Sequence, residues 1–221
     1  MTAPADGAAR FAARFPVVWH VVEADGLAGV EAHGLLPASE LLRRAGLPPT
    51  DRNRDDFLRV PLGPGGEGGP AAILRFQLMA DAKITPSLQG AFAGQPARWR
   101  ALIDSQVFFW PDPVRRDSFL RACLRDRQRS RTAPLHAPPV VLAFRTAALL
   151  AGQTDQAFYS TFNTGSTVRG AARARRDENT FRPVTGYRSG PAAEFAIRGI
   201  VPPEVLAAAK CDPAQTTTTT R

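Results

Sequence analysis

The chain has 221 residues, enough for one domain with a buried core, and its 44% hydrophobic and 22% charged residues are typical of a globular protein. Its formal charge is +8, with Lys83 and Lys210 as the only lysines. Such an arginine excess favours an anionic partner, although a GC-rich genome also raises the arginine content. Two cysteines, three histidines without metal-ligand spacing, and the absence of both a secretory signal and an apolar run of roughly 18 residues predict a cytoplasmic protein without metal or membrane contacts.

The N-terminal quarter of the chain mixes a loose beginning with short regular elements. Residues 1–15 lack a sustained apolar face, so we expect a flexible arm. Residues 16–22 (PVVWHVV) are rich in β-branched and aromatic side chains and predict a buried strand. We then expect one short helix capped by Asp25 and ended by Gly34, and a second over residues 39–46.

The middle of the chain begins with a segment that is difficult to assign. Residues 47–70 are so rich in glycine and proline that they predict a long loop without a regular element. Residues 71–78 (AAILRFQL) fit either a strand or the start of a helix. After them the pattern predicts a helix at 96–105, a strand at 106–110 and a long helix at 113–131.

The C-terminal part predicts three further strands and two short helices. The strands cover 139–146, 156–162 and 192–200, and the helices cover 147–151 and 202–210. Strands and short helices alternate irregularly, without the period of a doubly wound sheet, so the predicted fold class is α+β. We expect one compact domain over residues 16–210 and a disordered tail over residues 211–221, which is rich in threonine.

Two ionisable residues stand within apolar strands at opposite ends of the domain. His20 interrupts VVWHVV, and Glu194 lies in AAEFAIRGI. A buried polar side chain costs free energy unless it is paired, solvated or used. His20 is therefore either a core histidine bonded to the backbone or a donor of a hydrogen bond to a ligand hydroxyl. Glu194 is likewise either paired with an arginine, solvated or functional.

Several segments resemble DarT-type and PARP-like ADP-ribosyltransferases. VWHVVEADGLAGVEAHGLL (18–36) is similar to the opening of those enzymes, and PAAEFAIRGIVPPEVL (191–206) is similar to the segment that holds their catalytic glutamate. SQVFFWPDP (105–113) resembles their aromatic strand, and TDRNRDDFLRVPLGPGG (50–66) loosely resembles their arginine-containing loop. Over residues 16–206, the chain resembles more closely a group of bacterial proteins with no established activity, which share a histidine-containing start, a VFFW strand and an NTG turn.

This resemblance implies a fold, a co-substrate and a site. It implies a central, mostly antiparallel, split sheet with short helices, and NAD as the co-substrate. It assigns Glu194 as the catalytic carboxylate, which holds the ribose and stabilises positive charge as nicotinamide leaves. It implies that His20 contacts a ribose hydroxyl and that Phe109 or Trp110 covers the nicotinamide. Finally, it implies that Arg52 or Arg54 binds the pyrophosphate.

Arginine clusters suggest nucleic acid, either DNA or RNA, as the acceptor. Arginines recur every four residues on one face of the predicted helix at 113–131, at Arg121 and Arg125 among others. The segment RGAARARR predicts a flexible clamp on phosphates with four arginines: Arg169, Arg173, Arg175 and Arg176. The alternative for the helix is an ordinary solvated face. Base stacking is not indicated, since aromatic residues are not interleaved with these arginines.

The sequence thus supports more than one hypothesis. The first is an enzyme that cleaves the nicotinamide–ribose bond of NAD and transfers ADP-ribose, with nucleic acid as the favoured acceptor. The second is a non-catalytic, arginine-rich module on the same fold that binds nucleic acid. A third is NAD-dependent removal of a 2′-phosphate from RNA, for which the expected arginine and histidine motifs are not evident. The sequence does not predict the oligomeric state.

Overall fold

The β-branched run VVWHVV forms a strand because it finds a partner of the same composition far along the chain. The computed structural model describes residues 5–48, 57–63, 69–75, 79–129, 137–166 and 174–212. In it, β1 (Val17–Val22) pairs antiparallel with β5 (Val140–Arg145) over its whole length. Two residues at the end of the described chain, β9 (Lys210–Cys211), extend this sheet beyond β5.

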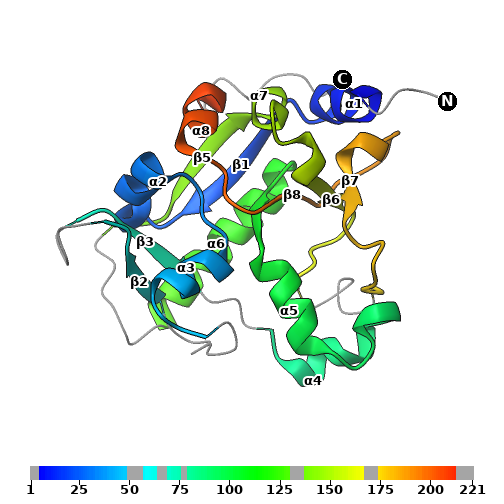
Figure 1. Ribbon diagram of the computed structural model, residues 1–221, viewed down its shortest axis with the longest axis horizontal. Coiled ribbons are helices and arrows are strands. Elements are labelled where there is room, and N and C mark those ends of the chain that lie inside the picture. Colours follow the sequence, from blue (N-terminus) through cyan, green and yellow to red (C-terminus); the bar gives the residue numbers. More distant parts are fainter. Residues whose placement is uncertain are drawn as a thin grey trace.

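A second antiparallel sheet contains the aromatic strand and the glutamate strand side by side (Figure 1). Its order is β4 (Gln106–Phe109), β8 (Glu194–Arg198), β6 (Ala157–Ser160) and β7 (Arg182–Pro183). The two sheets meet where the backbones of Trp19 and Trp110 bind each other, with N···O distances of 3.0 and 2.7 Å. The expected α+β class and the split antiparallel arrangement are thereby confirmed.

A hairpin forms a third, smaller sheet. Its first strand lies inside the segment that was predicted to lack regular structure, and its second shows that residues 71–75 of the segment 71–78 form a strand and not the start of a helix. Strand β2 (Phe57–Pro61) pairs with β3 (Ala71–Arg75), so the prediction of an unbroken loop over residues 47–70 is wrong for 57–61. Tertiary contacts stabilise this hairpin, because Val60 and Leu74 pack against Leu42 of the neighbouring helix α3 (Ala38–Arg44) in a separate apolar cluster. That burial offsets the low strand preference of the flanking glycines and prolines.

The helices surround these sheets and are mostly short. Their bounds are α1 (Ala5–Arg14), α2 (Leu27–His33), α3 (Ala38–Arg44), α4 (Asp81–Ile84), α5 (Pro96–Asp104), α6 (Pro113–Arg129), α7 (Thr146–Leu150) and α8 (Pro203–Ala209). Gly34 ends α2 with a φ of 78°, as predicted. Asp25, however, does not cap that helix, because it lies inside a 3₁₀ turn (Ala24–Gly26) that leaves Gly26 at the N-cap.

Helix α1 occupies residues 5–14 of the arm that was predicted to be flexible over residues 1–15, so that prediction is wrong for this part, and residues 1–4 lie outside the described residues. Phe11 is fully buried, and its ring lies 5.8, 5.2 and 5.4 Å from the rings of Tyr159, Tyr187 and Phe195. The helix approaches closely at Gly7, where an added Cβ would lie 1.9 Å from the carbonyl oxygen of Thr185. Our sequence interpretation missed this helix although Ala8, Phe11 and Ala12 recur at helical spacing, and the folded sheets provide the surface that covers this face.

The C-terminal boundary of the domain also differs by a short distance from the prediction. Cys211, which was placed in the disordered tail, belongs to β9 and pairs with Ala143 of β5. The rest of the predicted tail, from residue 213 onward, lies outside the described residues.

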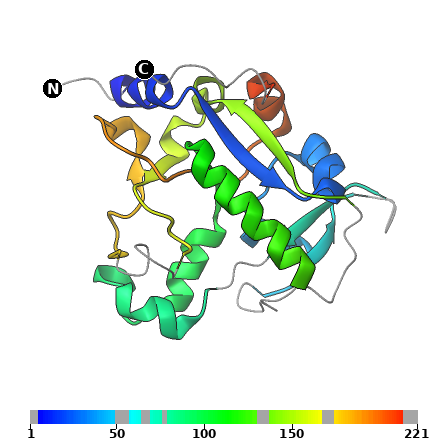
Figure 2. The ribbon, with the colours of Figure 1, turned by 180° about the vertical axis from the view of Figure 1, so that it is seen from behind.

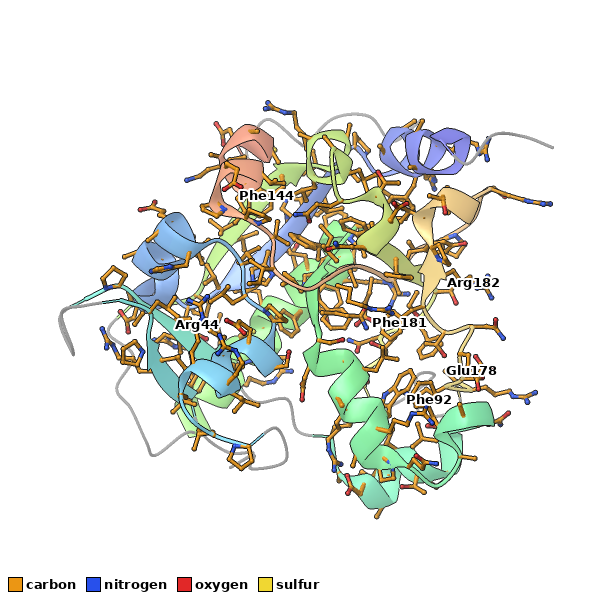
Figure 3. The ribbon with its side chains drawn as sticks, in the orientation of Figure 1. Arg44, Phe92, Phe144, Glu178, Phe181 and Arg182 are labelled. Atoms are coloured by element: carbon orange, nitrogen blue, oxygen red, sulfur yellow. The ribbon has the colours of Figure 1, made fainter. Side chains whose placement is uncertain are left out.

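Two apolar clusters hold the larger sheets. The main one lies between the two sheets and α1, α7 and α8, and it includes Phe144 of β5 (Figure 3). The second lies beside α5, where Trp99 packs between Phe92 and Phe181 with ring distances of 5.2 and 6.0 Å. Helix α6 runs alongside β1, as the view from behind shows (Figure 2). A buried ion pair between Glu23 and Arg127 fastens the far end of that helix.

Candidate functional site

A pocket lies where the two larger sheets meet, beneath α6. It has a volume of about 120 Å³. Side chains from both sheets, from α6 and from the turn after β6 line it: His20, Val21, Phe108, Trp110, Phe119, Thr164, Gly165 and Glu194. His20 and Glu194, which are 174 residues apart in the sequence, therefore share one cavity.

His20 is held in the pocket wall by the backbone of the aromatic strand. The contact between Trp19 and Trp110 brings β1 against β4, and His20 Nδ1 lies 2.8 Å from the carbonyl oxygen of Phe108. A carbonyl oxygen only accepts hydrogen bonds, so Nδ1 carries the proton. Burial lowers the pKa of His20 and favours the neutral ring, which leaves Nε2 as an acceptor. The structure thus shows the backbone bond that was the first alternative for His20, and on the pocket side the remaining ring nitrogen is an acceptor rather than the expected donor.

Glu194 lies at the first position of β8 and is only 4% exposed. The backbone N–H and the hydroxyl of Thr164 both donate to Oε2, at 2.9 and 2.7 Å. Burial raises the pKa of the carboxyl group to about 7, against the bonds from Thr164 and the charges of Arg115 and Arg176, which favour ionisation. Both described hydrogen bonds fall on Oε2, which leaves Oε1 available to a ligand.

Strand alternation decides which aromatic rings reach the pocket. Phe109 pairs with Phe195, is fully buried, and packs in the main core behind the pocket wall. Its predicted role beside nicotinamide is wrong, because successive side chains of a strand point to opposite faces. Phe108, opposite Ala196, lines the pocket in its place, and Trp110 lines it too.

The sequence analysis missed residues that only neighbouring elements bring to the pocket. Phe119 arrives from α6, and its ring lies 4.8 Å from that of Trp110. Thr164 and Gly165 belong to the NTGS turn after β6. Two signals were available in the sequence: the NTG turn is one of the motifs shared with the bacterial group that the chain resembles, and it directly follows a buried strand. Arg115, also from α6, carries a charge close enough to favour ionisation of Glu194.

The arginines that were predicted to bind pyrophosphate or nucleic acid differ in their exposure and in whether the structure describes them. Arg52, Arg54, Arg169 and Arg173 lie outside the described residues. Arg121 and Arg125 are exposed on α6, and Arg175 is exposed with its Nε bonded to Gln89. Arg176 is fully buried, so its predicted contact with nucleic acid is wrong. Its guanidinium group binds protein carbonyl and hydroxyl oxygens instead, because burial demands internal partners.

A second, larger cavity of about 260 Å³ lies between α2, β5 and α8. Its walls are mostly apolar, with Leu142, Phe144 and Leu206 among them, and its charged groups, Glu31 and Lys210, are exposed. It contains none of the residues predicted to be functional. The smaller pocket, which joins a buried carboxyl group to a neutral imidazole, is thus the better candidate site.

Within the described ranges, no three His, Cys, Asp or Glu side chains gather as a metal site would require. Over the same part of the chain, no helix is both long enough and apolar enough to span a bilayer.

Comparison with known families places this pocket in a wider context. A family model described as "Family of unknown function (DUF7002)" matches residues 16–206. The chain belongs to this family. The DUF7002 match begins just before β1 and ends within α8, so it includes all eight residues that line the pocket, whereas α1 precedes it. No curated protein matches the chain.

Proposed function

We propose that this pocket cleaves the nicotinamide–ribose bond of NAD and that the protein transfers the ADP-ribose to an acceptor, with nucleic acid favoured. One observation carries the proposal: the buried Glu194 carboxyl group, bound at Oε2 by Thr164, shares an aromatic-walled pocket with the neutral His20. The order of His20, the VFFW strand and Glu194 along the chain, and its resemblance to DarT-type enzymes, also support it.

The size of the pocket fits part of such a substrate. Pockets that enclose a whole small ligand measure about 300–1,000 Å³. A volume of about 120 Å³ accommodates one ring, either the nicotinamide or its ribose. Trp110, Phe108 and Phe119 supply flat apolar walls for that ring. The rest of the substrate would lie outside the pocket, and its pyrophosphate would take Arg115 of α6 as a partner in place of Asp112, whose Oδ2 lies 3.7 Å from Arg115 Nε.

The proposed reaction needs a carboxylate at the ribose. As the bond from C1′ to the nicotinamide nitrogen breaks, its electron pair leaves with the ring, and positive charge develops on the ribose. Ionised Glu194 stabilises that charge, and His20 Nε2 accepts a hydrogen bond from a ribose hydroxyl. An acceptor oxygen or nitrogen then bonds to C1′ and releases its proton to solvent. Neutral nicotinamide, ADP-ribosylated acceptor and one proton are the products.

The pH dependence follows from Glu194. The ionised form is required, and the pKa is about 7. We therefore expect nicotinamide release to increase as the pH rises from 6 to 8 and then to level off. Neutral His20 does not limit this range, because burial lowers its pKa from the ordinary value of 6.5.

The decisive experiment measures free nicotinamide by mass spectrometry after incubation of the pure protein with NAD, alone, with single-stranded DNA and with RNA. Glu194→Gln should reduce release by about a hundredfold or more, because it removes a charge from the transition state. Glu204→Gln, an exposed carboxylate on α8, is the matched control and should retain full release. Undiminished release in Glu194→Gln would reject the assignment.

The role of His20 is tested with a variant that keeps the hydrogen bond made by Nδ1 and removes the one proposed for Nε2. His20→Asn keeps a donor near the position of Nδ1, toward the Phe108 carbonyl oxygen, and removes Nε2. We expect a folded protein with nicotinamide release lowered about ten- to a hundredfold, the loss of one hydrogen bond to the reacting sugar. An equal effect on folding and on release would assign His20 to the core instead.

The non-catalytic alternative rests on different residues. Arg121 and Arg125 are exposed on α6, the helix that also contributes Phe119 to the pocket. If the protein only binds nucleic acid, binding should weaken with salt and should be the same in wild type and Glu194→Gln, with no nicotinamide released from NAD under any condition.

A further inference from the structure

Arg176 is a buried charge whose hydrogen bonds gather around one turn. Its Nε donates to the carbonyl oxygen of Thr164 at 3.1 Å, and Nη2 donates to that of Ser166. Nη1 donates to Ser87 Oγ at 2.9 Å and to the carbonyl oxygen of Ala174 at 3.0 Å. All three guanidinium nitrogens thus have acceptors, and two of them bind the NTGS turn.

The backbone of Arg176 is fixed as firmly as its side chain. Its N–H donates to the carbonyl oxygen of Ser87, and its own carbonyl oxygen accepts from Gln89 N–H, both at 2.9 Å. The ring of Phe162 lies 5.3 Å from the guanidinium carbon. The guanidinium group therefore rests on a rigid support and has little freedom to follow movements of the turn.

The same turn holds the carboxyl group of Glu194. Thr164 accepts from Arg176 through its carbonyl oxygen, and it donates to Glu194 Oε2 through its N–H and its hydroxyl. A residue whose carbonyl is fixed has little rotational freedom left for its N–H and side chain. Burying a charged guanidinium group costs free energy, which an apolar side chain of the same size would not. A fully buried arginine in this series of hydrogen bonds therefore points to a role other than packing.

We propose that Arg176 is a positioning residue for Glu194: it fixes the turn at Thr164 and Ser166, so that Thr164 binds Oε2 and leaves Oε1 for the ligand. The catalytic meaning of this role rests on the proposed function, whereas the role itself concerns only the carboxyl group. Arg176 also favours the ionised form by its charge, since it lies within electrostatic range of Glu194.

The test follows the titration of Glu194 rather than catalysis. Carbon-13 NMR of protein labelled at the glutamate carboxyl carbon reports the ionisation midpoint, and Glu194→Gln identifies the signal. The wild-type midpoint should lie near 7, and the Thr164 amide proton should shift over the same pH range. Thr164→Val, which removes the hydroxyl, should raise the midpoint by about one pH unit, and Thr164→Ser should restore it.

Arg176→Lys keeps the charge and loses the planar group that spans two carbonyl oxygens. It should raise the Glu194 midpoint and reduce the response of the Thr164 amide, whereas Arg175→Lys, at the exposed neighbour, should change neither. Ser87→Ala removes one acceptor of Arg176 without touching Thr164 or Glu194, and it should cause a smaller shift in the same direction. It decides the question even if Arg176→Lys fails to fold.

The outcomes separate the two proposals. A shifted titration in Ser87→Ala or Arg176→Lys supports positioning, even if the wild-type protein releases no nicotinamide and the proposed function fails. An unchanged midpoint and an unchanged Thr164 response in every folded variant at positions 87 and 176 would overturn the role of Arg176. Nicotinamide release that survives in those variants, with an unaltered titration, would leave the proposed function standing without it.

Discussion

Burial shifts the pKa values of Glu194 and His20 in opposite directions. Burial disfavours the charged form of each group, so it raises the pKa of the carboxyl group and lowers that of the imidazole. Near neutral pH the pocket therefore contains an imidazole without charge beside a carboxyl group close to its midpoint. Small changes of environment, such as a bound cation or a lost bond from Thr164, would shift the carboxyl group between its two forms.

The raised pKa of Glu194 predicts that removing this carboxylate stabilises the protein. A carboxyl group with a pKa of about 7 when folded and 4.5 when unfolded binds its proton more tightly in the folded state. Stability is therefore lost as the pH rises from 4.5 through 7. Glu194→Gln should remove this loss and raise the free energy of unfolding above pH 7 by up to about 3 kcal/mol, with little change at pH 4.5.

Urea unfolding at pH 5, 6, 7 and 8 measures this effect, with Glu204→Gln as the exposed control. The difference between Glu194→Gln and wild type should grow at each step. A difference that stays constant with pH would mean that Glu194 titrates normally in the folded protein. The prediction concerns folding alone, so it holds whatever the pocket binds.

At the level of single residues, the sequence predicted the centre of the site and not its surroundings. A histidine or glutamate inside an apolar strand is a local signal, because its desolvation must be offset. Phe109 was assigned wrongly, since nothing in QVFFW says which of two adjacent rings faces the ligand. Arg176 was assigned to a flexible clamp because its charge is visible in the sequence and its internal partners are not.

At the scale of secondary-structure elements, helix α1 shows how a local pattern and tertiary burial together stabilise a helix. Ala8, Phe11, Ala12 and Phe15 have the i, i+3, i+4, i+7 spacing of one helix face, an amphipathic signal that our sequence interpretation overlooked among the alanines and arginines. Burial of Phe11 against three aromatic rings supplies the stabilisation. The strands with continuous β-branched or aromatic runs, β1, β4 and β5, were predicted because their signal is local.

Phe11→Ala should therefore destabilise the whole domain, by about 3–5 kcal/mol, which is typical for truncation of a fully buried phenylalanine. Thermal and urea unfolding measure the loss. Ala13→Ser, on the exposed side of the same helix, should remain within about 0.5 kcal/mol of wild type. A flexible arm, as the sequence alone suggested, would give no difference between the two variants.

At the scale of the whole molecule, the net charge of +8 attracts polyanions, and the position of the arginines determines where they bind. Arg121 and Arg125 are exposed on α6, beside the pocket that Phe119 of the same helix helps to line. Arg43 and Arg44 of α3 instead pair with Glu40. The two pairs of arginines thus allow a comparison at equal change of net charge.

If nucleic acid binds along α6, Arg121→Gln/Arg125→Gln should reduce the magnitude of the slope of log affinity against log salt by about 1.4, the contribution of two phosphate contacts on a single strand. Arg43→Gln/Arg44→Gln should change it by much less. Fluorescence anisotropy with labelled single-stranded DNA and RNA between low and moderate salt gives both slopes. Equal effects of the two double variants would mean that only the overall charge attracts the polymer.

The sequence by itself determined the α+β class, most of the helices and strands, and the two ionisable residues of the pocket. Each depends on short-range patterns: hydrophobic period, β-branched runs, or a polar residue among apolar ones. Tertiary structure alone decided where helix α1 docks, the pairing of β2 with β3, which aromatic ring faces the pocket, and the internal hydrogen-bond partners of Arg176. These depend on contacts between distant segments, because burial and hydrogen-bond partners exist only once the two sheets have met at Trp19 and Trp110.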